Sequence, residues 1–385
     1  MTSYFSSDFK LAILGGGQLG KMLLYETRKF DIQTLVLDPN PEAPSRLAAN
    51  FFQQGDLMDY DTVYQFGKRA DIVTFEIEAV NVDALEQLEA EGITVYPSPK
   101  TLRKIQDKGV QKDFYTEKNI PTAPYKKYPN LADLKLALTA NQSSFPFVWK
   151  STQGGYDGKG VQVVRSQEDL EKLVDTPCIA ERMIPFKNEL AVIVVRSPKG
   201  EVKTYPVVEM EFHPEANQVE YVICPGRIDD KVATKAREVA TQVSEAFEHV
   251  GLLAVEMFQT EDDEILVNEV APRPHNSGHY SIEGSYTNQF EQHLRAILNL
   301  PLGETESKIG AVMVNLVGAE GHTGDVYYEK IEDIMALKGV TPHIYGKRET
   351  RPFRKMGHVT IVNSDLSEAR NIAEQVKNAI RVITK

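Results

Sequence analysis

The sequence has few of the features that would set the protein apart from ordinary soluble proteins. Only two of its 385 residues are cysteines, Cys178 and Cys224, and their spacing fits neither a disulfide framework nor a metal motif. Both are expected to be small buried hydrophobic residues in a reducing compartment. No apolar run reaches the roughly 18 residues that a membrane span needs, and residues 1–10 lack the basic and apolar segments of a secretion signal. We therefore expect a cytoplasmic protein.

Basic residues are in the minority. Lysine and arginine number 43 against 55 aspartates and glutamates, which gives a formal net charge of −12. This balance disfavours a general affinity for nucleic acids or anionic membranes, although it leaves room for a local basic site. Hydrophobic residues make up 42% and charged residues 25%, which excludes the disordered and fibrous classes. A chain of this length can form two or three domains, each with its own core.

The first hundred residues alternate short apolar runs with an amphipathic one. Residues 11–14, 34–37 and 70–75 predict buried strands, and residues 18–29 have the apolar spacing of a helix. This alternation predicts a parallel sheet with helices on both faces.

Prolines interrupt this pattern after residue 96. A polar helix is expected over residues 101–119, and Pro121 and Pro124 mark a boundary. A smaller α/β unit follows, and beyond it come alternating apolar segments, a long helix over 230–250 and a final helix after Asp365. We therefore predict an α/β (α+β) fold with three parts, which cover residues 1–120, 121–192 and 193–385.

Residues 268–279 concentrate acidic, basic, amide and hydroxyl side chains directly after a strand-like run. Glu256 lies in a strand-like run upstream, and a hairpin turning at residues 262–263 would pair Glu256 with Glu269 on one face. Two carboxylates so close repel each other unless a cation lies between them, and oxygen ligands of this kind suit Mg²⁺ together with the phosphates of a nucleotide. The alternative is that the carboxylates are solvated or pair with Arg273.

Residues 15–20 read Gly-Gly-Gly-Gln-Leu-Gly and fit the fingerprint of a dinucleotide-binding loop between a strand and a helix. Asp38 follows where an acidic residue would bind a ribose hydroxyl. This motif supports a different function, that of an NAD(P)-dependent oxidoreductase. The same glycines also suit a simple phosphate site or close packing of the helix on the strand.

A second glycine-rich loop, at residues 154–160, follows the strand-like run that ends in Lys150. Its four glycines would let backbone N–H groups close over phosphate oxygens, while Lys159 and Lys150 would add positive charge. The Gly-Lys-Ser/Thr ending of a Walker loop is absent. A surface hairpin without a ligand is the alternative.

Two further stretches have the chemistry of nucleotide or phosphate contacts. Residues 181–185 follow a short strand-like run, an arrangement that often binds adenine through backbone amides, with Glu189 for the ribose. Five basic residues lie between positions 347 and 355, and arginine and lysine bind phosphate well in a concave site. A solvated acid and a solvated basic loop are the respective alternatives.

Together these motifs resemble those of ATP-grasp enzymes and, within that superfamily, of the 5-(carboxyamino)imidazole ribonucleotide synthetase family of de novo purine biosynthesis. The resemblance runs nearly end to end. It rests on the loop at 15–20, Gln-Asp-Lys at 106–108, Gly-Gly-Tyr-Asp-Gly-Lys-Gly at 154–160, Glu-Val-Ala-Pro-Arg-Pro-His-Asn-Ser-Gly at 269–278 and Arg-Lys-Met-Gly-His at 354–358. It implies an ATP-grasp fold with an N-terminal Rossmann-like domain that no longer binds a dinucleotide, a small lid domain and a larger C-terminal domain. ATP would lie between the lid and the large domain.

The resemblance also implies roles for individual residues. ATP contacts would come from Lys108, Lys150, Gly155, Tyr156, Gly158, Lys159, Gly160, Glu181, Arg182, Met183, Ile184, Glu189, His213, Asn268 and Glu269. The ribonucleotide would meet Gln18, Tyr156, Asp157, Lys159, Arg273, His275, Asn276 and Ser277, with Arg351 and Lys355 on its phosphate. Mg²⁺ would be held by Glu256 and Glu269. The catalytic residues would be Arg273 for bicarbonate and carboxyphosphate, Lys159, and either Asp157 or His275 for the proton of the amine.

The implied reaction is an ADP-forming carbon–nitrogen ligation. Bicarbonate attacks the γ-phosphate of ATP to give carboxyphosphate and ADP, and the CO2 that carboxyphosphate releases is captured by the exocyclic amine of 5-aminoimidazole ribonucleotide. A homodimer is expected, with a separate mutase for the next step because a mutase-like domain is absent. The formate-dependent glycinamide ribonucleotide transformylase is the nearest alternative, since it shares the Pro-Arg-Pro-His run. Asn276-Ser277 and the 354–358 ending favour the carboxylating enzyme.

The sequence departs from the family pattern at two positions. Ala271 stands where many ATP-grasp enzymes have an asparagine metal ligand, so two carboxylates, phosphates and water must complete the magnesium site. Phe353 replaces the glycine of the usual basic loop, which affects only the local backbone shape of the phosphate site.

Overall fold

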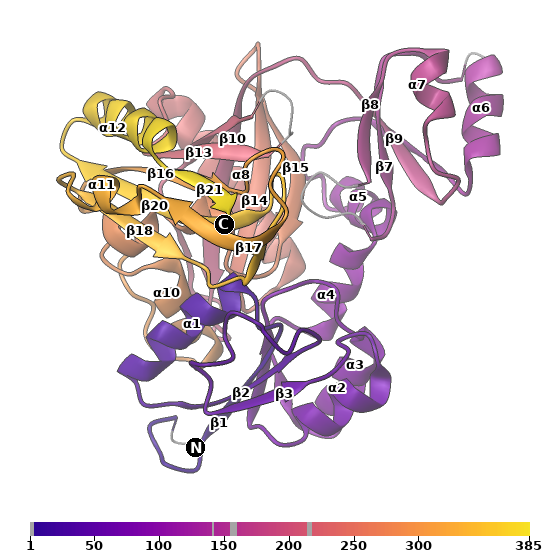
Figure 1. Ribbon diagram of the computed structural model, residues 1–385. Helices are drawn as coiled ribbons and strands as arrows, with labels where there is room; N and C mark the ends of the chain where they lie inside the picture. The colour runs from indigo at the N-terminus through magenta and orange to yellow at the C-terminus, as the bar shows by residue number, and fades with distance from the viewer. Residues whose placement is uncertain (1–3, 141, 155–159, 214–217) are drawn as a thin grey trace.

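The computed structural model describes residues 4–140, 142–154, 160–213 and 218–385. Figure 1 shows three parts: an indigo N-terminal part at the bottom, a magenta part projecting at the upper right, and a large orange to yellow part at the upper left. The projecting part is called the lid below. The chain therefore forms three parts, as expected from the sequence.

The N-terminal part is a five-stranded parallel sheet with the strand order β3-β2-β1-β4-β5. Successive side chains of a strand point to opposite faces. Ala12 and Leu14 accordingly join a core with α2 and α3, whereas Leu11 and Ile13 join a second core with α1 and α10. The sheet covered on both faces confirms the prediction. Its elements are β1 Lys10–Leu14, α1 Gln18–Lys29, β2 Gln33–Asp38, β3 Phe51–Gln54, α2 Tyr60–Gly67, β4 Ile72–Phe75, α3 Val82–Ala90 and β5 Thr94–Val95.

The single polar helix expected over residues 101–119 is wrong. The chain forms α4 (Pro99–Gln106) and α5 (Lys108–Glu117), with Asp107 between them in an extended conformation. The Asp107 carboxylate accepts hydrogen bonds from the backbone N–H groups of Gly109 and Val110, so it caps α5. This break places Lys108 at the first position of a new helix.

The lid is a four-stranded antiparallel sheet with the order β6-β9-β7-β8. Its two helices lie together at the right edge of Figure 1. Leu134, Phe147 and Trp149 belong to a hydrophobic cluster formed only by lid residues. The elements are β6 Tyr125–Tyr128, α6 Leu131–Thr139, β7 Phe147–Ser151, β8 Val161–Val164, α7 Gln167–Glu171 and β9 Cys178–Arg182.

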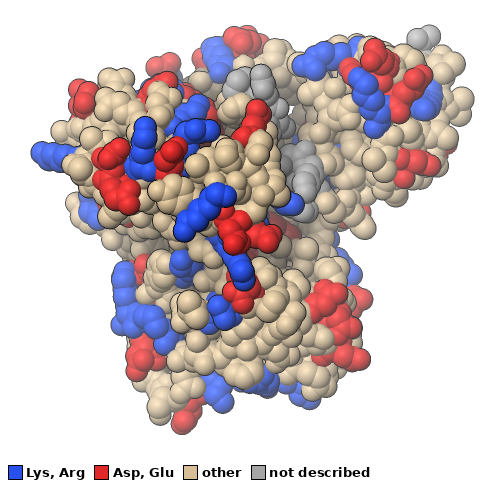
Figure 2. Space-filling model, in the orientation of Figure 1, with Lys and Arg blue, Asp and Glu red and all other residues tan. Residues whose placement is uncertain are grey.

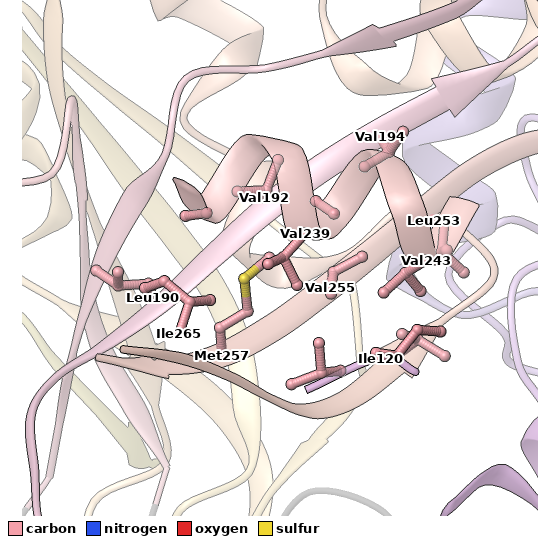
Figure 3. Close-up of a cluster of buried hydrophobic side chains, with 14 of the residues drawn as sticks. Ile120, Leu190, Val192, Val194, Val239, Val243, Leu253, Val255, Met257 and Ile265 are labelled. Atoms are coloured by element: carbon pink, nitrogen blue, oxygen red, sulfur yellow. The ribbon is translucent and has the colours of Figure 1, made fainter. Parts of the chain in front are cut away.

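The large part is built on a nine-stranded sheet whose main path runs β15-β14-β10-β12-β13-β16-β20-β18, with β11 paired to β10. Figure 3 shows Val239 and Val243 of α8 against Val192, Leu253 and Val255 of the sheet. The helix ends at Phe247 rather than near residue 250, because Glu248 takes a left-handed conformation with φ of 52°.

The remaining bounds complete the large part. β10 runs unbroken from Phe186 to Arg196, so the boundary expected at 192–193 falls inside a strand, and we propose Pro185 as the end of the lid. The other elements are β11 Val202–Thr204, β12 Val208–Phe212, β13 Val219–Cys224, α8 Asp230–Phe247, β14 Gly251–Thr260, β15 Ile265–Ala271, η1 Asn276–Gly278, α9 Ser281–Gly284, α10 Gln289–Ile297, β16 Gly310–Val317, β17 Gly324–Glu329, α11 Ile331–Met335, β18 Val340–Ile344, β19 Glu349–Thr350, β20 Lys355–Asn363, α12 Leu366–Ala379 and β21 Arg381–Thr384.

The cysteines, the helices and the surface charges bear on the expectations drawn from composition. Cys178 and Cys224 are both buried and unpaired with each other. In the part of the chain that the structure describes, no helix is long and apolar enough to cross a bilayer. Figure 2 shows acidic and basic side chains interspersed over the visible face of the molecule.

Candidate active site

The hairpin of β14 and β15 brings together the two glutamates on which the predicted metal site depends. Glu256 is paired with Glu269 across the two strands, as expected. The His275 Nε2 atom lies 3.4 Å from a carboxylate oxygen of Glu256, and the Lys108 ammonium lies 2.6 Å from Glu269. The start of α5, the middle of β14, the last part of β15 and the turn after β15 therefore meet at one place.

A β-bulge at Asn268 shapes this hairpin. Met257 pairs with Val267 while Glu256 pairs with Glu269, so Asn268 has no partner residue on β14. Bulges re-aim side chains, and Asn268 and Glu269 are both partly exposed although they are neighbours. The Lys150 ammonium donates to the Asn268 amide oxygen at 2.8 Å. The bulge thus places an amide beside the glutamate pair and connects the lid to it.

The carboxylates at this site have unequal affinities for a proton. Burial raises the pKa of Glu256, and the nearby Glu269 and Glu189 raise it further. In contrast, Lys108 holds the pKa of Glu269 well below its usual range. Burial also raises the pKa of Glu189, on β10, to about 7. Such a site is short of positive charge, which a divalent cation would supply.

Glu181 lies between two lysines. Its carboxylate lies 2.9 Å from the ammonium groups of both Lys112 and Lys150, and its side chain is only 4% exposed. The Arg182 N–H is also used, since it donates to the Pro124 carbonyl. Met183 and Ile184 follow directly in the connection to β10, so the predicted adenine contact rests on their backbone.

Arg273 forms an ion pair that the sequence reading did not include. Its Nε atom lies 2.9 Å from a carboxylate oxygen of Glu78, which follows β4 in the N-terminal part. This contact connects Arg273 to the N-terminal part. The Gln106 amide donates to the carbonyls of Glu78 and Val80, which fixes the loop that carries Glu78.

His275 is held by both its backbone and its ring. The Gln289 side chain accepts from the His275 N–H and donates to the His275 carbonyl, each at 2.8 Å. The Nδ1 atom accepts from the Ser277 N–H, so the proton of a neutral ring is on Nε2, the atom that faces Glu256. Asn276 exchanges two amide hydrogen bonds with Asn315. Asn276 and Ser277 thus order the turn that presents His275.

The glycine loop at residues 15–20 is closed by the protein's own carboxylates. Glu76 accepts hydrogen bonds from the N–H groups of Gly17 and Gly20, and Asp38 accepts from the N–H of Gly16 at 2.6 Å. The backbone donors that a pyrophosphate would use are therefore already bonded to the protein's own carboxylates. This geometry argues against the oxidoreductase alternative. Gln18 begins α1 at the rim of this loop.

The basic segment at residues 347–355 is partly satisfied internally. Lys347 donates to the Lys355 carbonyl, Arg348 lies 3.6 Å from Asp325, and Arg354 donates to the Glu349 carbonyl. Arg351 is exposed, and Lys355 is close enough to Glu256 to lower the pKa of that carboxyl group.

Phe353 stands where the basic loop of the family usually has a glycine. It takes a φ of 61°, in the left-handed region that glycine adopts easily, with a phenylalanine in place. Its ring meets the His213 ring at a centroid distance of 5.7 Å. Both residues line a cavity of about 450 Å³ beside the basic segment.

Several predicted site residues cannot be placed. Gly155, Tyr156, Asp157, Gly158 and Lys159 lie outside the described residues. Gly160 is described, and its carbonyl accepts from the Ser151 N–H at the base of the loop.

Sequence reasoning missed four residues of this site: Glu76, Glu78, Lys112 and Gln289. Signals existed for the first three. Glu76 and Glu78 follow a predicted parallel strand, and ligands of such sheets bind at the carboxyl ends of strands. Lys112 is one helical turn after Lys108. Gln289 gave no signal, because its contacts with His275 depend on tertiary folding.

Comparison with known proteins agrees with this geometry. Models of the ribonucleotide synthetase preATP-grasp domain, the ATP-grasp domain and the phosphoribosylaminoimidazole carboxylase C-terminal domain match residues 9–106, 113–290 and 311–372. A fold of this kind, with facing carboxylates between a lid and a large sheet, defines an ATP-grasp protein.

The relatives narrow the class further. The N5-carboxyaminoimidazole ribonucleotide synthase of Synechococcus elongatus is 37% identical over 376 residues, which cover 96% of this chain and 93% of the relative. The chain belongs to the N5-carboxyaminoimidazole ribonucleotide synthase family. It spans about 64% of the length of longer relatives named phosphoribosylaminoimidazole carboxylase.

Solved structures are similar over nearly the whole chain. The N5-carboxyaminoimidazole ribonucleotide synthetase of Thermotoga maritima has a TM-score of 0.89 and 43% identity, with 98% of this chain and 100% of that chain covered. The synthase of Aspergillus clavatus, in complex with ADP and 5-aminoimidazole ribonucleotide, has a TM-score of 0.88 and 35% identity, with 97% and 98% covered.

Proposed function

We propose that the protein carboxylates the exocyclic amine of 5-aminoimidazole ribonucleotide in an ATP- and bicarbonate-dependent reaction. The products are 5-(carboxyamino)imidazole ribonucleotide, ADP and phosphate. The observation that carries this proposal is the pairing of Glu256 with Glu269 beside Lys108 and Lys150, with Arg273 and His275 on the next turn of the chain. Groups for a nucleotide and groups for a small anion thus adjoin.

The donor set fits magnesium. Glu256 and Glu269 offer hard carboxylate oxygens, and the raised pKa of Glu256 shows that burial and like charge disfavour its ionised form unless a cation is near. Among the described residues no three side chains of the metal-ligating types converge, so phosphate oxygens and water would complete the coordination. When bound, the ion would neutralise charge on the transferred phosphoryl group.

The residues around Glu256 and Glu269 contact different parts of the nucleotide. Lys150 and Lys108 neutralise phosphate oxygens, Met183 and Ile184 meet the base, and Glu189 and His213 meet the remainder of the nucleotide. The lid residues 155–160 would cover the phosphates and exclude water from carboxyphosphate.

Arg273 and His275 serve the second half of the reaction. The Arg273 guanidinium, oriented by Glu78, offers parallel N–H groups to bicarbonate and then to carboxyphosphate. Bicarbonate oxygen attacks the γ-phosphorus, the bond to ADP breaks, and carboxyphosphate then separates into CO2 and phosphate. The amine of the ribonucleotide attacks CO2 and loses one proton, for which His275 or Asp157 is the acceptor. Arg351 and Lys355 bind the ribonucleotide phosphate.

A substrate matrix tests the proposal. ADP release is measured with bicarbonate or formate, each with 5-aminoimidazole ribonucleotide or glycinamide ribonucleotide. Stimulation by bicarbonate with the aminoimidazole is expected. Stimulation only by formate with glycinamide ribonucleotide would favour the transformylase, and the lack of any response to aminoimidazole ribonucleotide would sink the proposal.

Substitution of Glu269 tests the role of the glutamate pair. We expect Glu269→Gln to lower kcat for ADP release by about 100-fold or more, because one of the two carboxylates that would hold the magnesium ion is lost. Glu264→Gln is the matched control, since Glu264 is an exposed residue in the turn of the same hairpin. An unchanged rate in Glu269→Gln would contradict the assignment.

The homodimeric state and the cytoplasmic location are also part of the proposal. Light scattering on the purified protein is expected to give twice the mass of the chain, and fractionation of cells that express it is expected to recover it in the cytosolic fraction. A monomeric mass would remove the first of these assignments.

A further inference from the structure

A buried charge network lies directly beneath the predicted nucleotide contact Lys150. Glu181 on β9 is placed between two lysines, and its oxygens lie 2.9 Å from the Lys112 ammonium and 2.9 Å from the Lys150 ammonium. The side chains of Lys112, Glu181 and Lys150 are 2%, 4% and 7% exposed. Three charges are therefore removed from water at one point.

Lys112 connects this network to the large part. Its ammonium donates to the Thr122 hydroxyl at 2.6 Å, and that hydroxyl donates to the Val267 carbonyl at 2.7 Å. Val267 immediately precedes Asn268, which accepts from Lys150. A closed set of contacts thus joins α5, two strands of the lid and the bulge of β15.

Stability alone does not explain a lysine at this position. Burial lowers the pKa of Lys112 to about 8, against the attraction of Glu181. Buried ion pairs are weak contributors to stability, and apolar residues of similar volume often serve equally well. The charges instead fix the orientation of a side chain. The Glu181 carboxylate has two oxygens, and when Lys112 binds one of them, the position of the other oxygen, which binds Lys150, is also fixed.

We propose that Lys112 is a positioning residue of the nucleotide site, which holds the Glu181 carboxylate so that Lys150 is fixed toward the phosphates of the nucleotide. The inference deepens the proposed function, and it rests on the part of it that assigns Lys150 to the nucleotide. Lys112 itself is buried, so it acts through Glu181.

The test compares nucleotide binding in Lys112→Met with that in the wild type. The dissociation constant of ADP with magnesium is measured through the fluorescence of Trp149, the only tryptophan, which precedes Lys150 on β7. It is expected to rise about tenfold, which corresponds to about 1.4 kcal/mol. KM for ATP is expected to rise similarly, while KM for aminoimidazole ribonucleotide stays unchanged. Lys118→Met, at the exposed end of α5, is the control and is expected to bind ADP normally.

A second variant separates positioning from folding. Lys112→Met combined with Glu181→Gln removes two of the three buried charges and leaves no Glu181 carboxylate without its Lys112 partner, so it is expected to recover part of the thermal stability that the single variant loses while ADP binding stays weak. ADP binding as in the wild type, in the single variant or in the stable double variant, would overturn the proposal. If aminoimidazole ribonucleotide does not stimulate ADP release by the wild type, the proposed function is refuted instead. The comparison of ADP binding would still decide the role of Lys112.

Discussion

At the scale of single residues, Glu76 decides what the first glycine loop does. The loop has the pattern of a dinucleotide site, but the Glu76 carboxylate occupies the position of an anion at the start of α1. The pattern of residues 15–20 carries no information about Glu76, which is about 60 positions away. The predicted strand and helix were confirmed, whereas the ligand that the motif usually indicates was replaced by a side chain.

A pH-dependent stability follows from this contact. Burial raises the pKa of Glu76 from 4.5 to about 7. Between these values the folded protein keeps a proton that the unfolded chain has lost, so the free energy of unfolding falls as pH rises, by up to about 3 kcal/mol from this group. Glu76→Gln removes this loss. We expect the Tm of the variant, relative to wild type, to increase between pH 5 and pH 8.

Scanning calorimetry at the two pH values measures this difference. The changed hydrogen bonding to Gly17 is expected to shift the Tm of the variant by the same amount at both pH values. The informative quantity is therefore how the Tm difference between variant and wild type changes with pH. Glu86→Gln, on α3 near the surface, is the control and should show no such change. An offset for Glu76→Gln that is equal at both pH values would refute the assignment.

At the scale of elements, the β14–β15 hairpin shows why a correct prediction can rest on incomplete reasoning. A turn at residues 262–263 was expected to give an uninterrupted ladder. In the structure Thr260 pairs with Glu264, so the loop is one residue longer than expected, and the bulge at Asn268 restores the pairing of Glu256 with Glu269. The loop and the bulge each shift the strand register by one residue in opposite directions, so the two shifts cancel. Alternation of side chains predicts faces, but a bulge depends on what the partner strand must accommodate.

The break between α4 and α5 had a local signal, because aspartate favours helix starts. Loops that join distant parts had none. The loop after β4 places Glu78 against Arg273, which is nearly 200 residues later. The residues of the site were therefore predictable where a motif lies in one stretch of chain, and the contacts that orient them were not.

Glu78 should affect bicarbonate more than ATP. Glu78→Gln removes the charge that pairs with Arg273, and a loss of about 1.4 kcal/mol corresponds to a tenfold change in rate. We expect kcat/KM for bicarbonate to fall at least about tenfold, with more ADP released per product formed because carboxyphosphate is held less firmly. Parallel assays of ADP and carboxylated product measure this ratio.

The control again is Glu86→Gln, whose ion pair with Arg103 is exposed. An increase in KM for ATP of the same size in Glu78→Gln would indicate general damage to the site. That result would contradict a specific action on Arg273.

At the scale of the whole molecule, the hydrophobic clusters show which parts are joined. Residues of α1 and β1 share one core with Phe290 and Leu294 of α10, so the N-terminal sheet and the large part are packed together. The lid instead has a cluster of its own. Polar contacts such as those of Lys112 and Lys150 link it to the remainder of the molecule. A part with a separate core can open without exposing the cores of the other parts.

A matched pair of substitutions tests this division. Leu134 of α6 and Leu294 of α10 are both fully buried, the first in the lid and the second in the shared core. Replacement of a buried leucine by alanine costs about 2–5 kcal/mol. By hydrogen exchange, Leu134→Ala should speed exchange in β6, β7 and β9 and leave β10, β14 and β16 as in the wild type. Leu294→Ala should speed exchange in β1 and in β14 together, because α10 contributes Leu294 to the core with β1 and Ala296 to a cluster with Leu252 and Ala254 of β14. Equal acceleration of the large sheet by Leu134→Ala would show instead that the lid and the large part unfold as one unit, and closure of the lid would then require the central sheet to deform.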